Sequence, residues 1–141
     1  MKFVLGIQSV FSSLLSLCVS IFIFKFSYCK ATIKESWRLR NPFGCIHAAA
    51  LVNFGEAVTA FAVLGYCESQ DHHFKGIVTK IEADYLKKAR GKLTGICTFG
   101  GVDPADSEKV VADLMDEKGQ IVAKVGFLLI YITDHCYLDN S

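Results

Sequence analysis

Asn41-Pro-Phe-Gly-Cys-Ile-His-Ala-Ala-Ala-Leu-Val-Asn-Phe-Gly-Glu-Ala-Val-Thr-Ala-Phe-Ala-Val-Leu64 is the stretch of this 141-residue chain that decides its fold. Its first half predicts a turn, because Pro42 fixes its own φ and Gly44 permits a sharp reversal. Its second half predicts a helix that is apolar on nearly every side and therefore lies inside the protein. A carboxylate in a buried helix must be paired, protonated or used in chemistry, which makes Glu56 the most informative residue. The residues that interrupt the apolar helix fall three apart and are expected on one side: Asn53, Glu56 and Thr59.

Strands are expected before and after this helix in the sequence, where apolar and polar residues alternate or apolar runs are bounded by turn residues. The last strand is apolar on both faces, so we expect it to be covered on both sides. One long helix after the first strand, followed by four strands in hairpin order, predicts an α+β domain in which an antiparallel sheet wraps around a single buried helix. The expected strands are 31–39, 77–85, 92–99, 110–115 and 120–133, and the expected connections are 68–75, 87–91, 100–106 and 116–119.

Residues 1–30 form an apolar segment that precedes a domain of residues 31–141. The run 3–24 carries no charge and has about the length of roughly 20 residues that spans a bilayer. Lysines and arginines follow it, so a membrane anchor would keep the domain on the cytoplasmic side, in an intracellular protein. A secretory signal cut after Cys29, a packing helix and a wrongly assigned gene start stay open as alternatives. A mitochondrial presequence is disfavoured because the segment lacks arginine.

Charge and cysteine content exclude several classes of protein. Lys and Arg total 15 against 14 for Asp and Glu, so there is neither a basic field for nucleic acid nor an acidic tail. Six cysteines without a C-x-x-C pair predict free thiols in a reducing compartment, and a disulfide framework would require an oxidising one. His72 and His73 are adjacent and no cysteine pair accompanies them. We therefore expect no metal and no cofactor.

The decisive stretch resembles the HotDog-fold acyl-CoA thioesterases of the phenylacetate-pathway type. Many of them carry Asn, then His six residues later, then an acidic residue nine further on, and this sequence has Asn41, His47 and Glu56 at those spacings. The resemblance is closest to an uncharacterised branch of unknown function, in which Ala-Ala follows the His and Glu replaces Asp. Residues 76–91 are similar to the same branch. The resemblance covers about residues 31–133 and implies the HotDog fold.

The resemblance also implies a reaction, the hydrolysis of an acyl-CoA to a free acid and CoA by a homodimer or dimer of dimers. The backbone N–H groups of Ala48 and Ala49, at the start of the helix, would polarise the thioester oxygen. Glu56 would act as general base or nucleophile. Asn41 and His47 would orient the site and the attacking water, and the acid would meet the turn of the partner chain.

Further residues are candidates for binding the substrate. Family members often carry Ser or Thr on the strand after the helix, and Thr79 is the residue here that could serve. Asn53 lies in the helix close to Glu56. A basic turn could hold the phosphates of CoA through Lys87, Lys88 and Arg90.

Each candidate also has a structural interpretation, and two other functions stay open. His47 could cap the helix, Asn53 could be a satisfied buried amide, and Glu56 could pair with Arg38, Arg40 or Arg90. The second hypothesis is a non-catalytic HotDog protein that binds acyl chains, acyl-CoA or a protein partner, tethered to a membrane through residues 3–24. The third is a hydratase, disfavoured because that signature needs an Asp five residues before the His.

Overall fold

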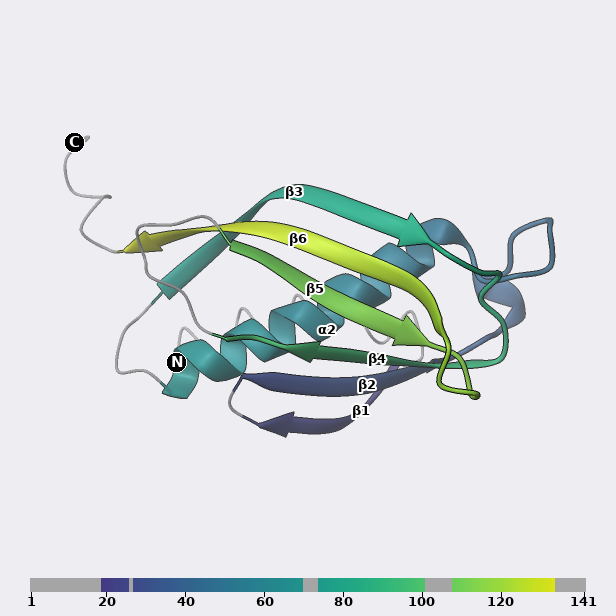
Figure 1. The fold of residues 1–141 in the computed structure, drawn as a ribbon, viewed down its shortest axis with the longest axis horizontal. Helices are drawn as coiled ribbons and strands as arrows, with labels where there is room; N and C mark the ends of the chain where they lie inside the picture. The colour runs from purple at the N-terminus through teal and green to yellow at the C-terminus, as the bar shows by residue number, and fades with distance from the viewer. Residues whose placement is uncertain (1–18, 26, 70–73, 101–107, 134–141) are drawn as a thin grey trace.

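The protein is an antiparallel six-stranded sheet with one long helix lying across one of its faces (Figure 1). The computed structural model describes residues 19–25, 27–69, 74–100 and 108–133. The strand order β1-β2-β4-β5-β6-β3 makes β1 and β3 the two edges. The predicted α+β architecture, a sheet around a single central helix, is confirmed. Its elements are β1 (Val19–Lys25), β2 (Tyr28–Lys34), the 3-10 helix η1 (Trp37–Leu39), α2 (Ala48–Ser69), β3 (Phe74–Tyr85), β4 (Lys92–Thr98), β5 (Glu108–Met115) and β6 (Ile121–Thr133).

The strand register separates an inner face, which holds the core, from an outer face. Val110 of β5 and Ile81 of β3 both lie opposite Phe127 of β6, and directly paired residues share a face of the sheet. Val110 and Phe127 are buried, so this is the face toward α2. Along each strand, the residues that alternate with these inward-facing ones point to the outer face. The outer face of β3, β5 and β6 therefore carries ion pairs between Lys80, Glu82 and Lys109 and between Asp113 and Lys124.

The prediction that the last strand is apolar and covered on both sides is partly wrong for its outer face. Gly126 is buried, but the stem of Lys109 covers it, and Lys124 next to it is exposed. Leu128 is half-buried beside the same lysine, whereas the outer residues Ile130 and Ile132 have side chains outside the described part. Long charged side chains thus cover the described outer face of β6, and a second apolar layer is not needed there.

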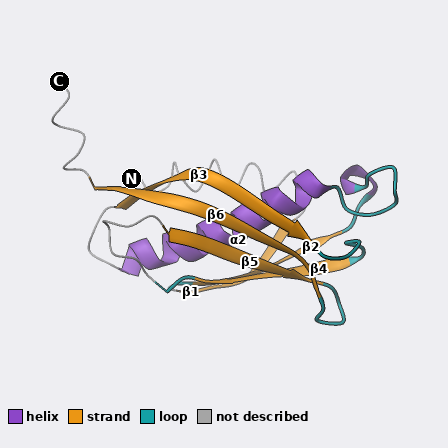
Figure 2. Cartoon of the chain, turned by 45° about the horizontal axis from the view of Figure 1, so that its top comes forward, coloured by secondary structure: helices purple, strands orange, loops and turns teal. Residues whose placement is uncertain are grey.

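Helix α2 lies along one face of the sheet (Figure 2), and glycines on both sides of the contact let the two pack closely. A Cβ built on Gly55 would lie 2.7 Å from the Cβ of Val125, and one built on Gly95 of β4 would lie 2.8 Å from Val58. Such contacts are shorter than packed carbon atoms allow, so only glycine fits at both positions. The buried residues of α2 are Leu51, Phe54, Gly55, Ala57, Val58, Thr59, Phe61, Ala62, Val63 and Gly65.

Within the described residues, α2 is also the helix that is long and apolar enough to span a membrane. In this fold 56% of its apolar window is buried, and the sheet covers that side of the helix. Its other side stays open in the single chain: Ala49 and Glu56 are exposed, and Asn53, Ala60 and Leu64 are half-buried. The expectation that the whole helix is enclosed is therefore wrong for one chain alone.

Thr59 does not share that open side with Asn53 and Glu56, contrary to the prediction. It is 3% exposed, and its hydroxyl donates to the backbone oxygens of Gly55 and Glu56 at 3.1 and 2.9 Å. Two steps of three residues rotate around an α-helix by about 120°, so the third residue turns toward the sheet. Its hydroxyl is satisfied inside the helix, and so its burial needs no other partner.

Several strands and helices begin or end at residues other than those predicted. The first predicted strand, 31–39, is β2, which starts at Tyr28 and ends at Lys34, and η1 takes its last three residues. The helix continues to Ser69 instead of ending at Leu64, so the connection predicted at 68–75 is shorter. The boundary predicted between residues 30 and 31 falls inside β2, and β1 before it is a sheet strand. The β-branched and aromatic residues of 19–24 favour a strand as much as an apolar span.

The remaining strands and turns lie close to their predicted places. β3, β4, β5 and β6 each overlap the predicted strand, and Gly119, with φ of 75°, closes the predicted turn at 116–119. Residues 101–106 of the predicted loop lie outside the described residues, as do His72, His73, Cys18, Cys136 and the run 3–18.

Two cysteines face each other in the core. Cys29 of β2 is directly paired with Cys97 of β4, and both are at most 1% exposed. The four described cysteines are free thiols, in line with the prediction. Burial raises the pKa of Cys29 to about 11. Burial, followed by the proximity of Cys29, raises the pKa of Cys97 to about 12.

These buried thiols predict a loss of stability in alkaline solution. Above pH 9.0 the unfolded chain gives up both thiol protons while the folded chain keeps them, so the free energy of unfolding falls as pH rises toward 11. The two thiols together should contribute a loss of about 2 kcal/mol between pH 9 and 10. Urea unfolding of the wild type and of Cys29→Ala/Cys97→Ala at several pH values measures it. Equal slopes against pH in the two proteins would contradict the assignment, whatever the absolute cost of the smaller side chains.

Candidate active site

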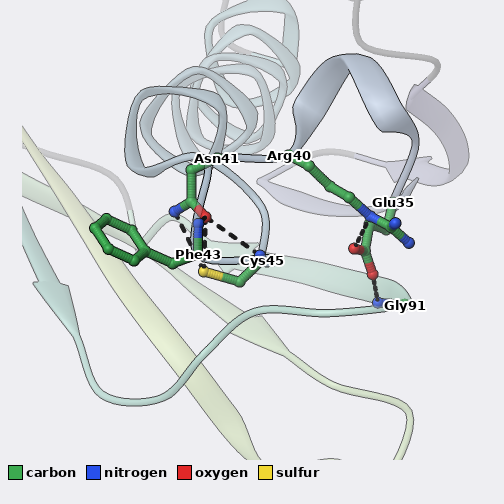
Figure 3. Close-up of polar contacts among 6 residues, drawn as sticks. All are labelled: Glu35, Arg40, Asn41, Phe43, Cys45 and Gly91. Carbon is green, nitrogen blue, oxygen red and sulfur yellow. Dashed lines mark hydrogen bonds and ion pairs between the residues drawn. The ribbon is translucent and has the colours of Figure 1, made fainter.

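The turn before α2 is held together by Asn41 (Figure 3). The Asn41 side-chain oxygen accepts hydrogen bonds from the backbone N–H groups of Phe43 and Cys45 at 3.0 and 3.3 Å, and its amide nitrogen lies 3.3 Å from the Cys45 sulfur. Gly44, with φ of 70°, donates its N–H to the Asn41 carbonyl. The described contacts of the Asn41 side chain are thus all inside the turn. Asn41 therefore positions the start of the helix. These contacts explain Asn41 without the predicted contact with a water molecule.

A carboxylate braces this turn against the neighbouring one at 87–91. Glu35 accepts hydrogen bonds from the Gly91 N–H at 2.6 Å and from the Arg40 guanidinium at 2.6 Å (Figure 3). Its side chain is 9% exposed. The hydrogen bond from the Gly91 N–H lowers the pKa of the Glu35 carboxyl, although burial opposes this shift. Arg40 lowers the same pKa further. The backbone joins the same two loops, because Ile46 N–H donates to the Ala89 carbonyl at 2.8 Å.

The start of the helix offers one free backbone donor. The His47 ring accepts the Ala49 N–H at its Nδ1 atom, 3.1 Å away, so His47 is the N-cap of α2. The Ala49 N–H is therefore occupied, which corrects its predicted role in an oxyanion hole. The Ala48 N–H has no partner in the described part of the chain, and Ala48 is exposed. Backed by the positive end of the helix dipole, it is a donor aimed at solvent.

Glu56 is exposed and carries no ion pair with any described residue. The structural alternative, a pair with a nearby arginine, is not formed: Arg40 binds Glu35, and Arg38 stacks on the Trp37 ring at 5.3 Å. The prediction that Glu56 is buried is wrong for a single chain, because α2 turns this residue to its open side. Asn53 is half-buried on the same side, one turn closer to the helix start.

The donor and the acid of one chain are too far apart to act on one carbonyl group. Ala48 and Glu56 are eight residues apart in the same helix, which separates them by roughly 12 Å along its axis. A thioester carbonyl needs a donor about 3 Å from its oxygen and the attacking water close to its carbon. A single chain therefore holds two half-sites, one at the helix start and one along the helix.

The basic residues lie beside the first half-site. Lys87, Lys88 and Arg90 are exposed on the turn that follows β3. Lys87 donates to the side-chain oxygen of Gln120 at 2.6 Å, and the Arg90 guanidinium lies next to Gly44. The structure thus places the basic turn against the turn of Asn41.

Thr79 lies in the middle of edge strand β3. It occupies a bulge, since Val78 pairs with Leu129 and Lys80 with the adjacent Leu128. Its hydroxyl donates to the Leu128 carbonyl at 3.3 Å. Tyr85, at the end of the same strand, donates its hydroxyl to the Ala48 carbonyl at 3.3 Å. Tyr85 was not among the candidates, because alternation marks it only as a strand residue.

Solved structures define the class of this fold. The E. coli PaaI protein from the phenylacetic acid degradation operon superposes with a TM-score of 0.77, at 11% identity, over 92% of this chain and 95% of that one. A hypothetical thioesterase from Streptococcus pneumoniae TIGR4, solved with coenzyme A, gives 0.76 at 16% identity over 89% and 96%. The thioesterase HI1161 from Haemophilus influenzae gives 0.73 at 20% identity over 86% and 82%. The chain has the HotDog fold.

The family is identified from the amino-acid sequence. Residues 9–130 match the model of the family described as "Domain of unknown function (DUF4442)", and the chain belongs to this family. No curated protein matches it.

Proposed function

We propose that the protein is a thioester hydrolase that converts an acyl-CoA to a free acid and CoA. The observation that carries the proposal is the Ala48 N–H, which has no partner among the described residues and lies at the start of a capped helix inside a HotDog fold. It is supported by the similar structures named thioesterases in Haemophilus influenzae and Streptococcus pneumoniae, the latter bound to coenzyme A.

In the proposed reaction the Ala48 N–H binds the thioester oxygen. Glu56 takes a proton from water as the water oxygen bonds to the carbonyl carbon, and the negative charge moves to the oxygen held by Ala48. The C–S bond then breaks, the carbonyl re-forms, and the CoA sulfur leaves with the proton from Glu56. If Glu56 is instead the nucleophile, its oxygen bonds to the carbonyl carbon, the C–S bond breaks and the CoA thiolate leaves, giving an anhydride between the acyl group and Glu56. Water then hydrolyses the anhydride, which releases the free acid, regenerates the Glu56 carboxylate and supplies the proton that the CoA thiolate takes up.

The proposed site is completed by a second copy of the chain. The half-site of one chain, at Ala48, then faces the half-site of its partner, at Glu56, in a homodimer or a dimer of dimers. Edge strand β3 favours this arrangement, because it leaves exposed apolar side chains and an unpaired edge that a second copy can cover. Those side chains are Ile77, Val78, Ile81 and Tyr85.

The other candidates bind the substrate in this proposal. Lys87, Lys88 and Arg90 hold the phosphates of CoA beside the helix start. Asn53, three residues before Glu56 in α2, and Thr79 of β3 contact the acyl chain of the substrate. Asn41 and His47 act indirectly, by shaping the turn and capping the helix, and Ala49 lines the entrance.

A binding protein without catalysis is the second candidate, favoured by one observation. The Ala49 N–H is occupied by His47, so the oxyanion would receive a single helix N–H instead of the two expected. Loss of one such donor typically costs roughly 3–4 kcal/mol of transition-state stabilisation. Such a protein would still bind acyl-CoA.

The test is hydrolysis of a panel of acyl-CoA thioesters, from short to long chains, by the purified full chain. We expect release of free CoA, measured with a thiol reagent, with kcat/KM highest for one range of chain lengths. Calorimetric titration with the same compounds runs beside it. Binding without turnover for every member of the panel would reject hydrolysis and leave the binding protein.

A further inference from the structure

One end of the molecule presents the most exposed aromatic side chains of the described residues on a braced loop. Trp37 is 78% exposed and Phe43 is 76% exposed, and Leu86, on the neighbouring turn, is 57% exposed. We call these three residues together with Arg38 the aromatic end. They gather where β2 and β3 end and α2 begins, at the right of Figure 1.

The loop that carries these aromatics is held firmly. Arg40 and Ile46 form a bridge across its base, and the His47 N–H donates to the Leu39 carbonyl at 2.7 Å. Asn41 closes the tip and Glu35 braces the base, as described above. A fixed loop that points large apolar rings at solvent gains nothing for its own fold. Exposed aromatic side chains of this kind mark an interaction surface.

The charges around the aromatic end are mostly positive. Residues 34–47 and 84–92 hold seven Lys and Arg against two Asp and Glu, a net charge of +5 in a chain whose total is +1. Of the two acids, Glu35 is already bound by Arg40 and Gly91. The Arg38 guanidinium lies 5.3 Å from the centre of the Trp37 ring. Aromatic rings flanked by cations fit the headgroup region of an anionic bilayer, where rings insert and cations meet phosphates.

Strand β1, with which the described chain begins, starts at the same end. Val19, where the described chain begins, pairs with Ile33, one residue before β2 ends at Lys34. Residues 3–18, which precede Val19, carry no charge. The described chain therefore begins on the side of the molecule that carries the exposed rings and the excess positive charge.

We propose that the aromatic end docks on the surface of an anionic phospholipid bilayer. Trp37, Phe43 and Leu86 enter the headgroup region, and the surrounding cations bind lipid phosphates. The inference does not depend on the proposed catalysis, but it would place the helix start next to a membrane, where long-chain acyl thioesters partition.

Trp37 is the only tryptophan in the chain, so its fluorescence reports on this surface alone. The full chain is mixed with phosphatidylcholine vesicles with or without about 30% phosphatidylserine. We expect a blue shift of the emission and quenching by brominated acyl chains with the anionic vesicles only, both weakened by salt. Phe43→Ser should reduce vesicle partitioning by roughly tenfold. The matched control Val111→Ser, an exposed apolar residue on the outer sheet face, should leave it unchanged.

Two outcomes would overturn the proposal. Vesicle binding with no change in Trp37 emission would mean that residues 1–18 alone hold the protein at the membrane. A blue-shifted emission without lipid that moves red on dilution would mean that a second copy of the chain covers the aromatic end. Because Phe43 is exposed, an unchanged melting temperature of Phe43→Ser separates lost docking from lost folding.

Discussion

Glu56→Gln is expected to lower kcat for acyl-CoA hydrolysis by about 10²–10⁴-fold, the usual contribution of a general base. Glutamine keeps the size and the hydrogen-bonding atoms of the side chain but cannot take a proton from water. KM should change little, since the carboxylate acts on the water and not on the bound CoA. Steady-state kinetics on the best substrate of the panel measure both constants.

Glu68→Gln is the matched control for this variant. Glu68 is also exposed on α2, about three turns further along and away from both half-sites. It should retain wild-type kcat, and both variants should keep the wild-type melting temperature because neither carboxylate is paired within the described residues. A Glu56→Gln protein with undiminished kcat would remove Glu56 from the mechanism.

The fold could be predicted because its signals are local. The apolar helix, the alternation in 77–85 and the turn at 116–119 follow from periodicity and turn chemistry, and each is close to its predicted position. β1 was missed because an uncharged run rich in Ile and Phe satisfies a membrane span and an edge strand equally well. Only the pairing with β2 distinguishes the two, and neither the composition nor the periodicity of 19–24 reveals it.

The site was less predictable, because it depends on which side of α2 the sheet covers. Composition indicated burial on every side, yet one concave sheet covers only part of a helix, and Glu56 faces away from it. The occupied Ala49 N–H could not be predicted either, because a His at the N-cap can be a site residue or a cap. Spacing alone does not distinguish the two. The motif Asn41, His47 and Glu56 stays a prediction: Asn41 and His47 shape the turn and cap the helix, and Glu56 lies on the open side of α2.

Ala48→Pro is expected to lower kcat/KM by about 10²–10³-fold, because proline removes the one free N–H at the helix start. The change should spare the fold. The first position of a helix is where proline is best tolerated, and the Ala48 side chain is exposed, so the ring has room. Kinetics on the same substrate, with a thermal melt beside them, measure the effect.

Ala48→Ser is the control, since it keeps the N–H while changing the side chain. It should stay within a few-fold of wild type. Equal losses in the two variants would show that the side chain at this position matters and that its N–H does not, which would remove the oxyanion role. Full activity in Ala48→Pro would have the same consequence.

Mixing the two inactive proteins then tests whether each site is shared between chains. In a dimer of one Glu56→Gln chain and one Ala48→Pro chain, one site combines the intact Ala48 of the first with the intact Glu56 of the second, and the other site has neither. Random pairing of equal amounts makes half of the dimers mixed, so about a quarter of wild-type turnover should return after co-refolding. If both groups act from the same chain, every site keeps one defect and no activity returns. The roughly 12 Å along α2 that separates Ala48 from Glu56 leads us to expect recovery.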